Sequence, residues 1–162
     1  MTLGALAMGL GFALAAVFAL LGASSATPAG PSADVLVRGK YLVDQVAMCG
    51  DCHSPHDEKG QLIQEKYLKG SVLPFKPIVP MPVWADKAPS IAGLPGWEQS
   101  AAIKFFMTGV AYNDLPARPP MPQYRFTKPD ASAVVAYLRS LEKSGSEASS
   151  SSAVRAGAAG FR

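Results

Sequence analysis

The feature that most constrains this chain is a run of five residues, Cys49-Gly50-Asp51-Cys52-His53. The pattern C-x-x-C-H is typical of covalent attachment of a c-type haem. One turn of backbone can present two thiols to the two vinyl groups on one porphyrin edge, and it places the adjacent imidazole beneath the iron. We therefore predict one covalent haem c, attached through Cys49 and Cys52, with His53 as an axial ligand.

Two other uses of this run are weaker alternatives. A thioredoxin-like redox pair is expected in a βαβ context, which the pattern of the chain does not show. A tetrahedral zinc site needs four ligands. Cys49, Cys52, His53 and His56 would supply four, but they are crowded into one short stretch. Because these are the chain's only cysteines and histidines, no second ligand pair can close such a site.

A methionine is the predicted sixth ligand of the iron. His56 lies three residues from His53 and is expected to stay on the same face of the porphyrin. Met81 and Met121 each lie between two prolines, whose fixed φ angles hold a loop in place around a weak thioether ligand. Met121 is preferred because its loop follows one expected helix and precedes the last. Met81 remains the alternative, with packing in its loop as its other role.

The composition divides the chain into four segments. Residues 1–23 are predicted to be a signal peptide or a transmembrane anchor, because an uncharged apolar stretch of ~20 residues can span a bilayer. No positive charge precedes Arg38, so the usual basic start of a signal peptide is missing, and cleavage is left open. Residues 24–33 are predicted to be a linker, 34–143 a folded domain and 144–162 a disordered tail.

Three main helices are predicted in the folded domain, over 34–47, 98–108 and 128–143. Gly109 is expected to end the second helix. The many prolines between residues 55 and 95 argue against both helix and sheet there. The predicted fold is therefore a small all-α domain whose proline-rich loops wrap around a haem that fills a thin core. The apolar sides expected for the helices are Val35, Gly39, Leu42, Val43 and Val46; Ile103, Phe106, Met107 and Val110; and Ala131, Val134, Val135, Leu138 and Leu141.

Three stretches resemble the class I cytochrome c family. They are the segment from Arg38 to His53, the run Arg118-Pro119-Pro120-Met121-Pro122, and the final helix around 133–141. The resemblance covers residues 36–142 and is greatest to cytochrome c subunits and domains that serve bacterial membrane-associated dehydrogenases. It does not place the long segment 59–87.

The resemblance implies roles for three further residues. Gly39 should let the first helix approach the last near Tyr137, because glycine has no side chain. Trp97 should donate its indole N–H to a haem propionate, and Pro89 should begin the loop on the propionate side. The carbonyl that orients His53 is not identified at this stage.

The predicted function is one-electron transfer rather than enzymatic catalysis, on the periplasmic side of a bacterial inner membrane, with the protein anchored or secreted. The expected partners are redox proteins, such as a membrane-bound dehydrogenase or a respiratory or photosynthetic complex. The net charge is +3 and no basic run is interleaved with aromatics, so nucleic acid is not an expected partner. The alternative is a haem peroxidase or gas sensor with a labile sixth ligand.

Overall fold

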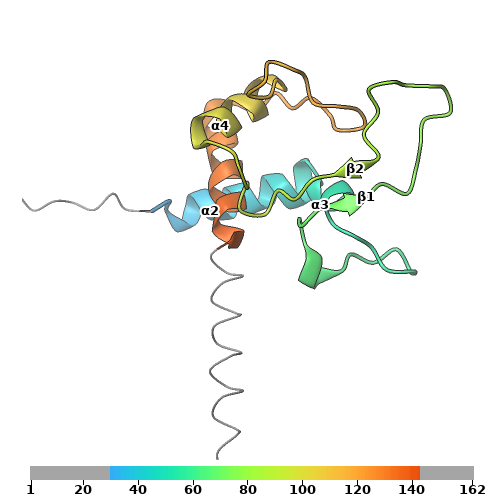
Figure 1. Cartoon of the computed structure of the whole chain (residues 1–162). Helices are drawn as coiled ribbons and strands as arrows, with labels where there is room; N and C mark the ends of the chain where they lie inside the picture. Colours follow the sequence, from blue (N-terminus) through green and yellow to red (C-terminus); the bar gives the residue numbers. More distant parts are fainter. Residues whose placement is uncertain (1–29, 143–162) are drawn as a thin grey trace, which may run out of the picture. The chain divides into compact units, whose positions relative to one another are not determined.

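The structure, a computed structural model, describes residues 30–142 (Figure 1). The predicted segments 1–23 and 144–162 lie outside these residues, as does most of the predicted linker 24–33. Within 30–142, no helix is long and apolar enough to cross a bilayer. The elements are α2 (Ala33–Tyr41), the π-helical turn η1 (Leu42–Val46), α3 (Cys49–His53), the 3-10 turn η2 (Gln64–Lys66), β1 (Ser71–Val72), β2 (Lys87–Ala88), α4 (Gln99–Thr108) and a C-terminal helix over 128–142.

The first predicted helix is confirmed, although it changes character along its length. Helix α2 begins after Ser32, and it continues without a break into η1. In this last turn the N–H of Ala47 donates to the carbonyl of Leu42 over 2.8 Å, which is the i to i+5 pattern of a π-helix. The sequence predicted the helix but not the π-helical turn.

The predicted apolar face of this helix is only partly correct. Gly39, Leu42 and Val43 are buried, but 37% of Val35 and 48% of Val46 is exposed. Val35 lies one helical turn before the buried stretch, near the free end of the helix. The extra residue in the π-helical turn rotates Val46 away from the side that Leu42 and Val43 share. Only the middle of the predicted stripe therefore contributes to the core.

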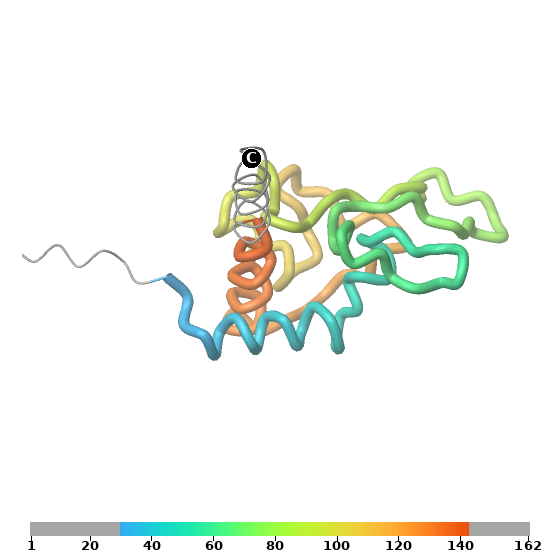
Figure 2. Tube along the Cα trace, turned by 90° about the horizontal axis from the view of Figure 1, so that it is seen from below, coloured from blue at the N-terminus to red at the C-terminus, as the bar shows by residue number. Residues whose placement is uncertain are grey.

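The first helix crosses the C-terminal helix at Gly39, and Figure 2 shows the two helices meeting at a steep angle. A Cβ atom on Gly39 would lie 2.1 Å from the carbonyl oxygen of Ala133 and 2.7 Å from the Cβ atom of Tyr137. Only glycine allows this approach of the two backbones. The predicted contact of Gly39 near Tyr137 is thus confirmed.

The other two predicted helices are also confirmed, the last one as far as residue 142. Gly109 follows α4 with φ of 73°, and its N–H donates to the carbonyl of Phe105. At the start of the C-terminal helix the N–H of Asp130 donates to the hydroxyl of Thr127 over 3.4 Å. The carboxylate of Asp130 accepts a hydrogen bond from Arg38 at 2.9 Å. The helices and loops share one apolar core, which includes Leu42, Val43, Leu68, Leu94, Ala102, Phe106, Ala131, Val134, Val135 and Leu138.

The proline-rich middle of the chain contains a short sheet, so the prediction of no regular structure there was wrong in this respect. Strands β1 and β2 are antiparallel, with Ser71 opposite Ala88 and Val72 opposite Lys87. The N–H of Leu73 donates to the carbonyl of Asp86 and closes a loop over 73–86. Pro74 follows directly and cannot donate to the ladder, which explains why the sheet stops there.

Candidate haem site

The attachment run forms one short helix, α3, as its spacing predicted. Met48 precedes it in the left-handed conformation, with φ of 47°, and separates it from the first helix. Cys49 is buried, Cys52 is half-buried, and both thiols are free. The structure therefore brings the two thiols and the imidazole of His53 together on a single turn.

The imidazole of His53 is fixed by a hydrogen bond that the sequence did not reveal. Its Nδ1 lies 2.7 Å from the carbonyl oxygen of Pro89. A carbonyl oxygen can only accept, so Nδ1 carries the proton and Nε2 keeps the lone pair that binds a metal. The ring is 6% exposed, and this burial lowers the pKa of His53. A neutral, oriented imidazole with a free Nε2 fits an axial ligand of haem iron.

The thiols do not have the properties of a redox pair or a zinc site. Burial raises the pKa of the Cys49 thiol to about 12, and burial also raises the pKa of Cys52. Redox-active cysteines act as thiolates, which a lowered pKa favours. Among residues 30–142 there is also no group of three or more His, Cys, Asp or Glu side chains placed to hold a metal ion. These observations argue against both alternatives to haem.

The loop that carries Met121 is hydrogen-bonded to the backbone just before the attachment turn. The hydroxyl of Tyr124 donates to the carbonyl of Ala47 over 2.8 Å, two residues before Cys49. Burial raises the pKa of Tyr124 to about 12, and the neighbouring Cys49 and Cys52 thiols add to this shift. Met121 itself is half-buried, three residues before Tyr124. The preferred candidate for the sixth ligand therefore lies on a segment held beside the two cysteines.

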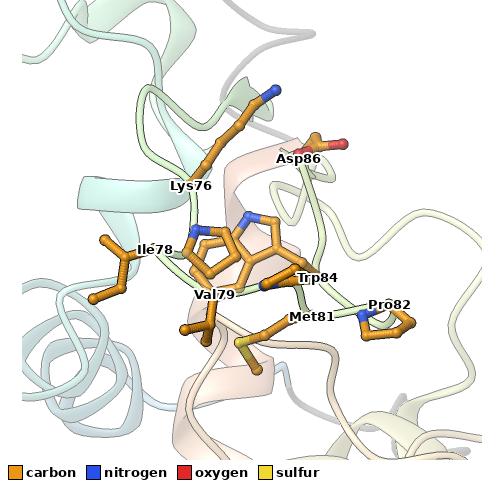
Figure 3. Close-up of a pocket in the computed structure, with 9 residues that line it drawn as sticks. Lys76, Ile78, Val79, Met81, Pro82, Trp84 and Asp86 are labelled. Carbon is orange, nitrogen blue, oxygen red and sulfur yellow. The ribbon is translucent and has the colours of Figure 1, made fainter.

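Met81, the other candidate ligand, lies in the loop 73–86 and is 37% exposed. Its side chain and that of Trp84 line an open pocket formed by residues 76–86 of this loop (Figure 3). The backbone carbonyl of Met81 accepts a hydrogen bond from the N–H of Trp84 at 3.0 Å. These contacts fit the packing role within the loop that was the other interpretation of Met81.

The two tryptophans have different surroundings. Trp97 is half-buried, and its ring contacts those of Phe105 and Tyr112 at centroid distances of 5.3 Å and 5.1 Å. Its predicted bond to a propionate stays a prediction.

Trp84, which sequence reasoning missed, has a buried indole N–H with no hydrogen-bond partner among the described residues. A buried donor needs an acceptor, and a haem propionate would supply one. The only signal for Trp84 in the sequence was a tryptophan within the proline-rich segment.

The helical fold, the paired thiols and the oriented imidazole together fit a covalent haem and define the class of c-type haem proteins. A sequence model of the cytochrome c family matches residues 36–142, which is more than half of the chain. The chain therefore belongs to the cytochrome c family, and this membership supports haem-based electron transfer.

The chain is also similar to the cytochrome subunit of a fructose dehydrogenase from Gluconobacter japonicus. The two sequences are 31% identical over 114 residues, which is 64% of this chain and 21% of the relative. The chain thus spans about a fifth of the length of that relative.

Proposed function

We propose that this protein transfers single electrons through one haem c that is attached at Cys49 and Cys52 and ligated by His53 and Met121. The observation that carries the proposal is the hydrogen bond of 2.7 Å between Nδ1 of His53 and the carbonyl of Pro89. His53 lies on the same turn as both thiols. This bond commits one ring nitrogen and leaves the other for iron. A hydrogen bond at the second nitrogen is the usual support of a metal-bound histidine.

Haem iron, when bound, supplies a one-electron couple between Fe(III) and Fe(II). The residues of the chain set how readily that electron moves. The apolar core around Phe106 and Leu68 would keep water away from the haem, and this favours the oxidation state of the haem iron that leaves less net charge. A thioether from Met121 favours ferrous iron and so raises the reduction potential. Trp97 is proposed to donate its indole N–H to a propionate.

The proposed electron donor is a dehydrogenase, because the relative from Gluconobacter japonicus is named as the cytochrome subunit of one. The proposed location is the periplasmic side of the inner membrane, where c-type haem is attached in bacteria. The apolar segment 1–23 would direct export or act as an anchor. The proposed work makes and breaks no bond in a substrate.

A spectroelectrochemical titration of the mature holoprotein tests this function. We expect a single one-electron wave and a reduced protein that does not bind carbon monoxide readily, because His53 and Met121 occupy both axial positions. Met121→Ala is expected to bind carbon monoxide. Ready binding to the unmodified protein would contradict the carrier function and favour the alternative of a gas sensor or peroxidase.

A further inference from the structure

The loop 73–86 and the turn over 118–121 are far apart in the sequence but joined in the fold. The N–H of Ala85 donates to the carbonyl of Pro119 over 2.8 Å. Figure 1 shows the segment after α4 reaching across to the loop between β1 and β2. The turn that ends at Met121 thus borders the segment that sequence reasoning could not place.

Arg118 makes the other bonds between these two segments. Its Nε donates to the carbonyl of Val83 over 3.1 Å, and a terminal guanidinium nitrogen donates to the carbonyl of Trp84 over 2.7 Å. The carbonyl of Arg118 also accepts from the N–H of Met121 at 3.1 Å. Arg118 therefore stabilises the turn 118–121 through its backbone carbonyl, and it joins this turn to the loop 73–86 through its side chain.

The segment that Arg118 grips is itself held in place. Its base is the β1–β2 ladder, which the bond from Leu73 to Asp86 extends. The Trp84 indole packs edge-on against the ring of Phe75, with centroids 5.9 Å apart. The carbonyls of Val83 and Trp84 are therefore acceptors in a well-ordered loop, and the turn before Met121 is hydrogen-bonded to that loop.

We propose that Arg118 is a positioning residue for the sixth ligand: it clamps the turn 118–121 to the loop 73–86 and thereby holds Met121 at the iron. The inference rests on the proposed function, in which Met121 is that ligand. A thioether is a weak ligand, so an added ligand such as imidazole can replace Met121 at the iron. This replacement costs the free energy needed to move the Met121 loop away. A loop held in its ligand-bound conformation is harder to move, so the free-energy cost of replacing Met121 rises.

The test is an imidazole titration of the oxidised holoprotein. Arg118→Ala removes both side-chain bonds to the loop 73–86, so imidazole should bind on the order of tenfold more tightly than to the unmodified protein. Arg125→Ala is the matched control, because it removes the same charge on the other side of Met121. Among residues 30–142, the guanidinium of Arg125 bonds only within its own segment, to Tyr124 and Gln123. This control should leave the affinity for imidazole unchanged.

A further variant separates geometry from charge. Arg118→Lys keeps the charge but replaces two separate donor nitrogens, Nε and a terminal nitrogen, with a single nitrogen. It too should therefore bind imidazole more tightly. Equal imidazole affinities in the unmodified protein, Arg118→Ala and Arg125→Ala would overturn the clamp. An unchanged imidazole affinity in Arg118→Lys would overturn the role of the two guanidinium bonds, because the positive charge alone would then hold the turn. Thermal unfolding of each variant identifies general destabilisation.

The two proposals fail in distinguishable ways. The far-red sulfur-to-iron band of the oxidised protein should disappear in Met121→Ala and persist in Arg118→Ala. Persistence of the band in Met121→Ala would overturn the ligand assignment and the clamp with it. Loss of the band in Met121→Ala, with unchanged imidazole affinity in Arg118→Ala, would overturn the clamp alone.

Discussion

At the scale of single residues, the proposed chemistry depends on which nitrogen of His53 faces the iron. The bond from Nδ1 to the carbonyl of Pro89 leaves Nε2 free for that role, since a carbonyl has no proton to give. Proline supplies this acceptor well, because its ring fixes φ and restricts the local backbone. The two cysteines then need only to face the porphyrin edge from the same turn.

Each cysteine should carry one of the two thioether bonds. Cys52→Ala should leave haem attached through Cys49 alone, with one vinyl group unsaturated. The pyridine haemochrome spectrum should therefore shift to longer wavelength, while haem still migrates with the polypeptide under denaturing conditions. Asp51→Asn, an exposed neighbour on the same turn, serves as control. An unshifted spectrum in Cys52→Ala would contradict the attachment.

The two candidate methionines can be separated by paired variants. Met121→Ala should lower the reduction potential, because the ferrous state loses its soft ligand. Met81→Ala should leave the potential near that of the unmodified protein, because Met81 packs within its own loop. Potentiometric titration of both variants measures this. The reverse pattern would assign the ligand to Met81.

At the scale of elements, the crossing of the first and last helices organises the fold. Gly39 provides the close contact, and the adjacent residue Arg38 pairs with Asp130 at 2.9 Å. The crossing joins residues more than ninety positions apart, so it fixes the two ends of the folded domain to each other.

Gly39→Ala tests the crossing. The added Cβ would fall 2.1 Å from a backbone oxygen, which cannot move aside as a flexible side chain can. We expect a loss of about 1–3 kcal/mol in the free energy of unfolding, as is typical of overpacking. Val37→Ala, at a position of the same helix that is 69% exposed, should change the free energy little. A Gly39→Ala protein as stable as this control would contradict the close approach.

The ion pair at the crossing should make stability depend on pH. The hydrogen bond from Arg38 lowers the pKa of Asp130, so the pair stabilises the fold above the ordinary aspartate pKa of about 3.9. This contribution is lost as pH falls through the lowered value. Denaturant unfolding should therefore find Asp130→Asn less stable than the unmodified protein at pH 7, with the difference vanishing in acid.

A double-mutant cycle with Arg38→Gln isolates the pair. The two substitutions should not be additive at pH 7, since either one removes the same bond. Additive losses would show that Asp130 acts through other contacts.

The elements also show what the sequence could predict. Apolar periodicity and end signals such as Gly109 are local, so they predicted the main helices. Two-residue strands have no period to detect, and β1 and β2 were missed. The bonds from His53 to Pro89 and from Arg118 to Val83 join residues 36 and 35 positions apart, and no local pattern encodes them. The attachment turn was predictable because its chemistry lies within five consecutive residues.

At the scale of the whole domain described by the structure, residues 30–142, the helices and a set of long loops share a small core. The attachment turn, the loop 73–86 and the segment with Met121 are bound to one another by hydrogen bonds rather than by regular sheet. A haem held between such segments would contribute apolar surface to the fold as well as iron to the function.

The most direct test of the central claim is the mass of the purified mature protein under denaturing conditions, measured together with its pyridine haemochrome spectrum. Covalent attachment at Cys49 and Cys52 predicts a mass that exceeds the polypeptide by one haem, and a spectrum of haem with both vinyl groups saturated. A mass equal to that of the bare polypeptide, or the absence of a haemochrome signal, would contradict the account.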